Sequence, residues 1–426
     1  MGLKIGSTSI GTLYLGATRV HEAYLGNIKL FESDWIDPNP LNLPANTMRF
    51  QFGDSSYDPT QETWHSNVTW TQVSASPNVW DYNNPDTNWG ATAVGGAPFK
   101  DRFTSARNQV DVLGANFSGI TYTDSMFRGC SALHSVVYFD TGDVTYAVQM
   151  FDGSGIVSAP AYRMANCTNT FAMFRNCTAL ASAGMLNLSA STNCGDLFRG
   201  CSALTSIAPI DVRSAQTLDS AFEGCSALTT TPSFITSTSL RSMGAIFAQC
   251  SNLRTVGLFN THNVHSASGA FRSCTSLQTI PAFDFYSLNT ASGMFMSCSS
   301  LSSLPSGIDF YSITDASNMF KGCSALASLP SGTDFHSLTN ADSICWDCSS
   351  LVSLPTITSS VVTNVDYAFQ NCRAVNGGAL AMYNQLVGQS TPPTNHYSCF
   401  YNCGSGTTTG AAELAQIPAS WGGTGA

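Results

Sequence analysis

The residues of this chain that could do chemistry are few and scattered. The seven histidines stand at positions His21, His65, His134, His262, His265, His336 and His396. Around them we find no order of nucleophile, histidine and acid, no phosphate-binding glycine loop and no pair of metal ligands at a suitable spacing. The sequence therefore predicts a protein that is not an enzyme, with no catalytic residue, no metal site and no cofactor.

Cysteine is frequent in this chain, with 15 copies among 426 residues. Cys345 with Cys348, and Cys399 with Cys403, are spaced like halves of a zinc site, but zinc usually needs a second pair or histidines at ligand spacing. Most of the cysteines stand at one position of a repeat, where a small apolar side chain buried in a stack is the simpler explanation. We therefore expect buried thiols rather than a zinc site or a disulfide framework.

The repeat that contains these cysteines extends from residue 126 to residue 403. Its clearest copy, Met319 to Pro330, reads Met-Phe-Lys-Gly-Cys-Ser-Ala-Leu-Ala-Ser-Leu-Pro. From Phe127 to Phe369 the anchor positions are 23 to 25 residues apart, with Cys345 in place of one phenylalanine. A fixed period of this size predicts a solenoid, because one unit cannot bury its apolar face alone whereas stacked units can.

Each unit is expected to contain a short strand and a short helical part. The Leu-x-Ser-Leu-Pro segment, as at Leu301–Pro305, is typical of a strand ended by proline, which cannot donate to a ladder. The Ala-x-x-Met-Phe segment, as at Ala316–Phe320, favours one or two helical turns. The predicted fold class is a leucine-rich-repeat-like solenoid of short strands and short helical turns, preceded by small all-β N-terminal units.

The repeated words also resemble a known family. Met-Phe-x-Gly-Cys-Ser-x-Leu-x-Ser-Leu-Pro, with Thr-x-Ala-x-x-Met-Phe between copies, is similar to the BspA-like leucine-rich repeat of bacterial surface proteins and phage tail proteins. The resemblance covers residues 120–403, with residues 404–426 as a C-terminal cap. It implies a fold and a style of binding, and it names no ligand.

The N-terminal residues carry a shorter repeat. Between residues 1 and 31 a pattern recurs every 10 residues, and the words Tyr14-Leu15-Gly16 and Tyr24-Leu25-Gly26 resemble the N-terminal module of phage tail and receptor-binding proteins. That resemblance implies attachment to other virion tail proteins. The alternative is a β-hairpin that caps the solenoid. Residues 32–45, rich in proline and asparagine, are interpreted as a linker.

Residues 46–119 form a different unit, which we expect to be a small β domain. It carries four of the seven tryptophans, Trp64, Trp70, Trp80 and Trp89. Tryptophan rings can hold sugars by stacking on a pyranose, so these four are an alternative glycan-binding site. The simpler interpretation, which we favour, is that the rings fill the core of a domain that covers the first coil.

One variable position inside the repeat is the sharper candidate for binding. Eleven residues before most anchors stands a short acceptor, which usually closes a turn through backbone N–H groups; these residues are Asn116, Asp140, Asn187, Asp211, Asn260, Asp284, Asp309 and Asp334. Two residues later the side chain varies, and the candidate receptor-binding residues are Arg213, His262, Tyr286, Tyr311 and His336. A varied column with aromatic and basic residues is typical of a binding surface. Simple surface drift is the open alternative.

Composition limits the possible partners. Only 10% of the residues are charged, against about 25% in an average globular protein, and the net charge is −10. We therefore expect no nucleic-acid partner, since no basic stripe is present to neutralise phosphates. No run of about 18 apolar residues occurs, so no membrane insertion is expected. The N-terminus also lacks a basic segment followed by an apolar one, which a secretion signal needs.

Together these features favour a protein of a phage virion. We expect a homo-oligomer in or on the tail, assembled in the host cytoplasm, whose repeat arm binds a glycan or protein receptor on the host surface. Two alternatives stay open. A bacterial surface adhesin with the same BspA-like repeat would need a leader, and a tail-borne depolymerase would degrade surface glycan.

Overall fold

The computed structural model describes most of the chain beyond residue 40. It covers residues 41–52, 55–62, 68–85, 89, 99–100, 103, 109–137, 141–236 and 238–425, together with the backbone of the short strands before residue 33. These strands pair antiparallel, β1 (Lys4–Ile5) with β2 (Thr8–Ser9), β3 (Leu13–Leu15) with β4 (Thr18–Val20), and β5 (Glu22–Leu25) with β6 (Ile28–Glu32). Each pair spans one copy of the 10-residue repeat.

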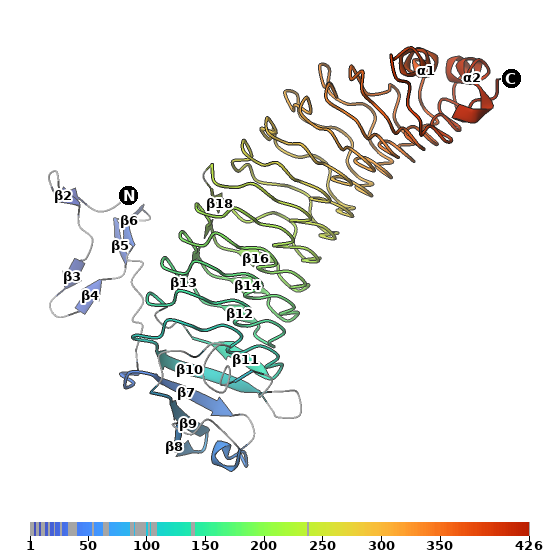
Figure 1. Cartoon of the computed structure of the whole chain (residues 1–426). Helices are drawn as coiled ribbons and strands as arrows, with labels where there is room; N and C mark the ends of the chain where they lie inside the picture. Colours follow the sequence, from blue (N-terminus) through green and yellow to red (C-terminus); the bar gives the residue numbers. More distant parts are fainter. Residues whose placement is uncertain are drawn as a thin grey trace.

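A five-stranded sheet precedes the solenoid (Figure 1). Its strands are β7 (Thr47–Phe52), β8 (Thr69–Ala75), β9 (Asn78–Asn83), β10 (Val110–Asn116) and β11 (Leu133–Val136), in the spatial order β11-β10-β7-β9-β8. The short helix η1 (Pro59–Gln61) lies between β7 and β8. All neighbours are antiparallel except β10 and β11, which pair parallel. Because β11 already belongs to the first coil, the sheet runs directly into the solenoid.

The repeat forms the predicted solenoid, a curved arm of stacked coils in Figure 1. Parallel bridges link each coil to the next from Tyr122 to Asn395. The anchor phenylalanines stack ring on ring, with centroids 5.1 Å apart between Phe174 and Phe198 and 5.6 Å apart between Phe295 and Phe320. Identical side chains thus build one continuous apolar core along the axis.

Regular strands occur in the first half of the solenoid. One ladder contains β12 (Ser158–Ala159), β14 (Ser182–Ala183) and β16 (Ser206–Ile207), and a second contains β13 (Tyr162–Arg163), β15 (Leu186–Asn187), β17 (Ile210–Asp211) and β18 (Phe234–Ile235). The predicted strand at Leu301–Pro305 is wrong, since this segment has no regular secondary structure. Gly184 and Ala208 donate their N–H groups to the preceding coil, whereas most later coils place proline there and lose the donor.

The predicted helical turns at Ala316–Phe320 are also wrong. Asn318 has a φ of 56° and Gly322 a φ of 75°, so each coil contains two left-handed residues four positions apart. An α-helix cannot contain such residues at this spacing. The Phe320 N–H instead donates to Ile344 O in the next coil at 2.8 Å, while the Met319 N–H donates to Ala316 O at 3.1 Å. This segment is a series of tight turns whose backbone groups bond alternately within a coil and between coils.

All 15 cysteines are buried thiols, as the sequence predicts. Within the repeat they have a partner that sequence reasoning missed. From Cys177 to Cys372, the thiol of each repeat cysteine lies within hydrogen-bonding distance of the anchor carbonyl of the preceding coil, as Cys201 Sγ does with Phe174 O at 3.0 Å and Cys323 Sγ with Phe295 O at 3.1 Å. Burial raises the pKa of Cys225 to about 12. A thiol that stays protonated at neutral pH is a donor and a poor nucleophile or metal ligand.

Short helices end the arm at its C-terminus (Figure 1). They are α1 (Ala379–Val387), α2 (Thr408–Leu414) and the single turn η2 (Ala419–Trp421). The Glu413 carboxylate accepts the N–H groups of Gly378 and Leu380 at 3.1 and 3.2 Å, which ties α2 to the beginning of α1. Among the described residues, no helix has the length and apolar character needed to cross a membrane.

Candidate binding surface

The short acceptors before each anchor close turns, as predicted. The Oδ1 atom of the acceptor receives the N–H of the residue two positions later in the coils of Asn116, Asn187, Asp211, Asn260, Asp284 and Asp309. Asp334 differs, because its Oδ1 receives the N–H of Thr358 in the next coil at 3.0 Å. Asp140 lies outside the described residues. These turns hold the backbone at the variable position, so its side chains are presented in a fixed register.

Four side chains of the variable position form what we call the ring column: His262, Tyr286, Tyr311 and His336. The rings of His262 and Tyr286 stack with centroids 5.4 Å apart and planes 7° apart. Those of Tyr311 and His336 stack at 4.4 Å and 6°. Tyr286 is 67% exposed and Tyr311 50% exposed. The expected alignment along one side of the arm is thus present as two stacked pairs on the surface.

Arg213 stands apart from the ring column. Its guanidinium makes hydrogen bonds to both oxygens of Asp211, at 2.9 and 2.5 Å. The coil between Arg213 and His262 places Thr238 at the same position. The structure therefore does not bring Arg213 together with the four rings, although all five residues share one register.

A shallow hollow of about 420 Å³ lies beside the first ring pair. Its lining contains Leu258, Phe259, Asn260, Thr261, His262, Ala282 and Asp284. His262 Nδ1 lies 2.8 Å from Asp284 Oδ2, and this hydrogen bond holds the pKa of the Asp284 carboxyl below its usual range. Leu258 is 67% exposed. The hollow thus combines an apolar contact with polar groups that can bond a hydroxyl or an amide.

Exposed apolar residues accompany the hollow along the same stretch of the coils. Met185, Ile235 and Leu258 are large and exposed, and each precedes the variable position by a few residues. The three stand in different coils, and Leu258 is the one that lines the hollow. Sequence reasoning missed this row, because it searched for constant positions and for polar variation. The apolar type of these residues at positions outside the buried columns was the available signal.

A second group of rings, partly exposed, lies in the last coils, and the sequence did not predict it. We call Lys321, Trp346, Tyr367 and Tyr397 the C-terminal ring cluster. The Lys321 ammonium lies 3.7 Å from the centroid of Trp346, whose ring stacks on Tyr367 at 5.2 Å. Tyr397 follows at 5.4 Å with its plane turned by 75° and is 64% exposed. These contacts join four successive coils.

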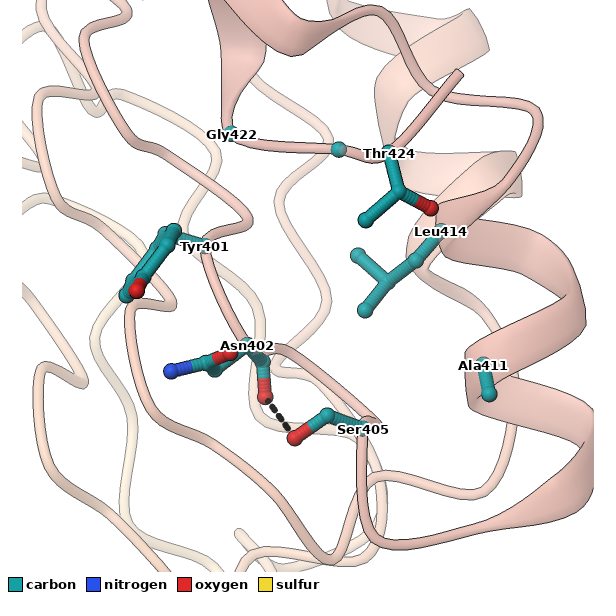
Figure 2. A pocket seen from close by; sticks show the side chains of 8 residues that line it. Tyr401, Asn402, Ser405, Ala411, Leu414, Gly422 and Thr424 are labelled. Carbon is teal, nitrogen blue, oxygen red and sulfur yellow. Dashed lines mark hydrogen bonds between the residues drawn. The ribbon is translucent and has the colours of Figure 1, made fainter.

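Beyond this cluster lies a small hollow of about 210 Å³ (Figure 2). Tyr401, Asn402 and Ser405 line one side of it, and Ala411 and Leu414 of α2 the other. The Ser405 hydroxyl donates to the Asn402 carbonyl at 3.0 Å. The side chains of its lining are hydroxyl, amide and apolar groups.

The glycan-binding alternative at the tryptophans is wrong for Trp80 and Trp89. Trp89 is fully buried, and Trp80 is buried with its Nε1 donating to Asn78 Oδ1 at 2.7 Å. Trp70 packs against Phe50 and Tyr82, with centroids 5.5 and 5.1 Å apart. Trp64 lies outside the described residues. The described rings fill the core of the N-terminal sheet, because both faces of a buried ring are covered and cannot stack on a sugar.

Metal-binding groups do not gather anywhere in the described part of the chain. Within it, no group of three or more histidines, cysteines, aspartates and glutamates has the arrangement that could hold a metal ion. Cys345 and Cys348 are both buried, and Cys348 Sγ lies 3.1 Å from Phe320 O. Their spacing therefore reflects the repeat, in which the thiols are directed at backbone carbonyls.

The chain has low-level similarity to several solved leucine-rich repeat proteins. The leucine-rich repeat protein of T. pallidum is 20% identical over 53% of this chain and 86% of that chain, with a TM-score of 0.28. A leucine-rich repeat protein from Eubacterium ventriosum is 13% identical over 56% and 79%, and a leucine rich cell surface protein from Faecalibacterium prausnitzii is 19% identical over 51% and 59%, each with a TM-score of 0.28. No curated protein matches the chain.

A protein-family model follows the repeat itself. The model described as "Mycoplasma protein of unknown function, DUF285" matches residues 98–210, 192–307, 238–356 and 271–383. The matches overlap because the family model is longer than one repeat unit, so each match spans several copies of the repeat. Because they cover well over half of the chain, this leucine-rich-repeat-like solenoid belongs to the DUF285 family.

Proposed function

We propose that the repeat arm is the binding arm of an adhesin-like surface protein and that it holds its partner along the ring column. This proposal rests on two exposed pairs of stacked rings, His262 with Tyr286 and Tyr311 with His336. Aromatic rings of this size are rarely left exposed without a contact to make, and they dominate binding energy at interfaces.

The surroundings of the ring column support the same function. The hollow beside His262, with the exposed Leu258 in its lining, adds apolar contacts to the rings. A solenoid presents one residue per coil at each column, so weak contacts add up along an extended partner. The partner is a surface glycan or a surface protein, since both offer apolar patches and hydrogen-bonding groups in a row.

The family match favours a bacterial setting over a virion. The family model takes its description from mycoplasma proteins. The virion setting is the second candidate, and it rests on the N-terminal hairpins, one per copy of the 10-residue repeat. In that setting residues 1–31 attach a homo-oligomer to other tail proteins. Capture of phage tail proteins by an immobilised peptide of residues 1–31 would favour the virion, and a failure to capture any would remove this candidate.

The binding proposal is tested with purified, labelled protein on whole bacterial cells and on glycans and proteins isolated from their surfaces. The test variant combines Tyr286→Ala, Tyr311→Ala and His336→Ala. Each ring contact contributes about 1 kcal/mol, so one substitution weakens binding about fivefold and all three about a hundredfold. Stability should hardly change, because the three side chains are exposed.

A matched control exists in another column of the same arm. Tyr122 and Tyr146 also stack, with centroids 5.3 Å apart and planes 4° apart. Changing both to alanine removes a partly exposed ring pair of similar geometry and should leave binding unchanged. If the triple variant stays folded and binds as tightly as the unchanged protein, the ring column is not the binding site.

We also propose that the arm binds without cleaving. In the part of the chain that the structure describes, the hydrogen-bonded pair of His262 and Asp284 is the one acid and base that line a hollow. Surface polysaccharide incubated with the protein should be retained at full length. Shortened chains that disappear in a His262→Gln variant would instead make the protein a depolymerase.

A further inference from the structure

Tyr367 holds a backbone conformation that its side chain disfavours. Its φ is 56°, in the left-handed region where bulky side chains collide with their own backbone. In the other coils the same position carries small or short polar residues or glutamine: Ser125, Gln149, Ala172, Asp196, Ser220, Ala245, Gly269, Gly293, Asn318, Ser343 and Ser398. A tyrosine there weakens the fold relative to asparagine or glycine. Strained residues of this kind concentrate at functional sites.

The strained ring is the centre of the C-terminal ring cluster. Tyr367 stacks on Trp346 at 5.2 Å and contacts Tyr397 at 5.4 Å. None of the three is fully buried, and Tyr397 is the most exposed. The cluster therefore does not fill a core, because the coils beneath it already have their own buried columns. A surface group that costs stability and fills no core needs another explanation.

Polar side chains accompany the rings in the neighbouring column. Asn371 Nδ2 donates to Asp347 Oδ1 at 2.8 Å, and Asn402 Nδ2 donates to Asn371 Oδ1 at 3.0 Å. These residues follow Trp346, Tyr367 and Tyr397 within five positions in the same coils. Amides and carboxylates each keep further lone pairs or hydrogens for a hydroxyl. The surface thus places a row of rings beside a row of hydroxyl partners.

We propose that Trp346, Tyr367 and Tyr397 form a second binding site, which takes a neutral glycan strand lying along the axis of the arm. Rings that recur every 5.2 to 5.4 Å match the length of one pyranose unit, so each coil contacts one sugar. An extended peptide fits less well, because its side chains recur on one face every ~6.7 Å. Sugar C–H groups contact the outward edges of the stacked rings, and sugar hydroxyls bond the neighbouring amides and carboxylates.

The charges at the site favour a neutral sugar. Asp342, Asp347 and Asp366 flank the rings, and the Lys321 ammonium is already placed over the Trp346 ring. A carboxylate on the ligand would meet these aspartates and be repelled. This site is separate from the ring column, and its existence does not depend on the adhesive role proposed above.

The test is electrophoresis of the full chain in native gels that contain a mannan, a mixed-linkage glucan or a galactan, with alginate as the acidic comparison. At least one neutral polymer should retard the unchanged protein, and alginate should not. Tyr397→Ala and Tyr367→Asn should each weaken the retardation at least about fivefold, as the loss of one ring contact does.

The variant Tyr367→Asn separates binding from folding. Asparagine tolerates the left-handed conformation, so this variant should melt at the same or a higher temperature than the unchanged protein while it loses binding. The control Tyr146→Ala, and the triple change in the ring column, should leave retardation as it was. The proposal is overturned if no neutral polymer retards the protein, if only alginate does, or if Tyr367→Asn binds as before.

Discussion

Two parts of the arm use the position directly after the anchor in different ways. In the first coils this position carries charged residues that form a ladder of ion pairs. Arg175 lies 2.8 Å from Asp152, and Arg199 lies 3.2 Å from Glu223. In the last coils the same position carries Lys321 and Trp346, which contact each other and the ring of Tyr367. The backbone turns beneath are alike in both parts.

The difference teaches which columns carry the fold and which are free to vary. The phenylalanine and cysteine columns are buried in both parts and bond or stack with their own kind. The ion-pair ladder adds stability in the first part, since its carboxylates are shared between guanidinium groups, as Asp152 is between Arg128 and Arg175. The last part replaces that ladder with exposed rings and a strained tyrosine. The replacement therefore does not make the last part more stable than the first.

The largest expected loss of stability should be the same in both parts of the arm. Phe198→Ala in the first part and Phe295→Ala in the last each remove a fully buried ring from the middle of the stack. Loss of the ring leaves a cavity and should lower the free energy of unfolding by about 3 to 5 kcal/mol. Urea denaturation of the two variants measures this. A cost that is small in one part and large in the other would mean that the core is not uniform along the arm.

The next effect should differ between the parts. Asp152→Ala removes the buried carboxylate that Arg128 and Arg175 share. We expect a loss of about 2 kcal/mol, less than for a fully buried pair because both guanidinium groups are partly exposed. The comparison change Asp347→Asn removes an exposed carboxylate of the last part, suits the left-handed backbone there (φ 62°) and should cost less than about 0.5 kcal/mol. Equal losses in urea denaturation would contradict the contrast.

A third pair of changes exchanges the type of residue at the strained position between the two parts. Tyr367→Asn should raise the free energy of unfolding by about 1 kcal/mol, because a bulky side chain with positive φ costs about 1 to 2 kcal/mol. The reverse change, Ser220→Tyr, introduces the same strain at a φ of 54° in the first part and should lower stability by a similar amount. Thermal melts compare both with the unchanged protein. A stabilising Ser220→Tyr would show that the ring itself supports the turn.

The sequence predicted the parts of the molecule that repeat. The anchor stack, the buried thiols and the turn acceptors such as Asp284 are constant from coil to coil, so the period alone reveals them. The helical turns at Ala316–Phe320 were predicted wrongly, because alanine and methionine favour helices. The local sequence contains no signal for the two left-handed residues in each coil. Tertiary hydrogen bonds between coils decide that conformation.

The C-terminal ring cluster was missed in the sequence for the opposite reason. Trp346 and Tyr367 each break a column in a single coil, and a search for the constant residue passes over a single exception. Their contact depends on the stacking of neighbouring coils, which places residues about 21 positions apart side by side. The burial of Trp80 and Trp89 likewise depends on the sheet packing around them. Exceptions to a repeat are therefore the positions at which a solenoid is best searched for function.

The smallest expected effect concerns an exposed carboxylate and so contrasts with Asp152. The hydrogen bond from His262 holds the pKa of Asp284 below its usual range, and the Tyr286 N–H contributes in the same direction. A carboxyl whose pKa is lower in the folded state stabilises the fold above the ordinary range near pH 4, and this contribution is lost as the pH falls through the folded-state pKa. In His262→Gln the pKa of Asp284 should rise toward its ordinary value, with almost no change in stability, because water screens the exposed pair. Carbon NMR titration of the carboxyl measures the shift, and an unchanged titration would mean that the Tyr286 N–H alone sets it.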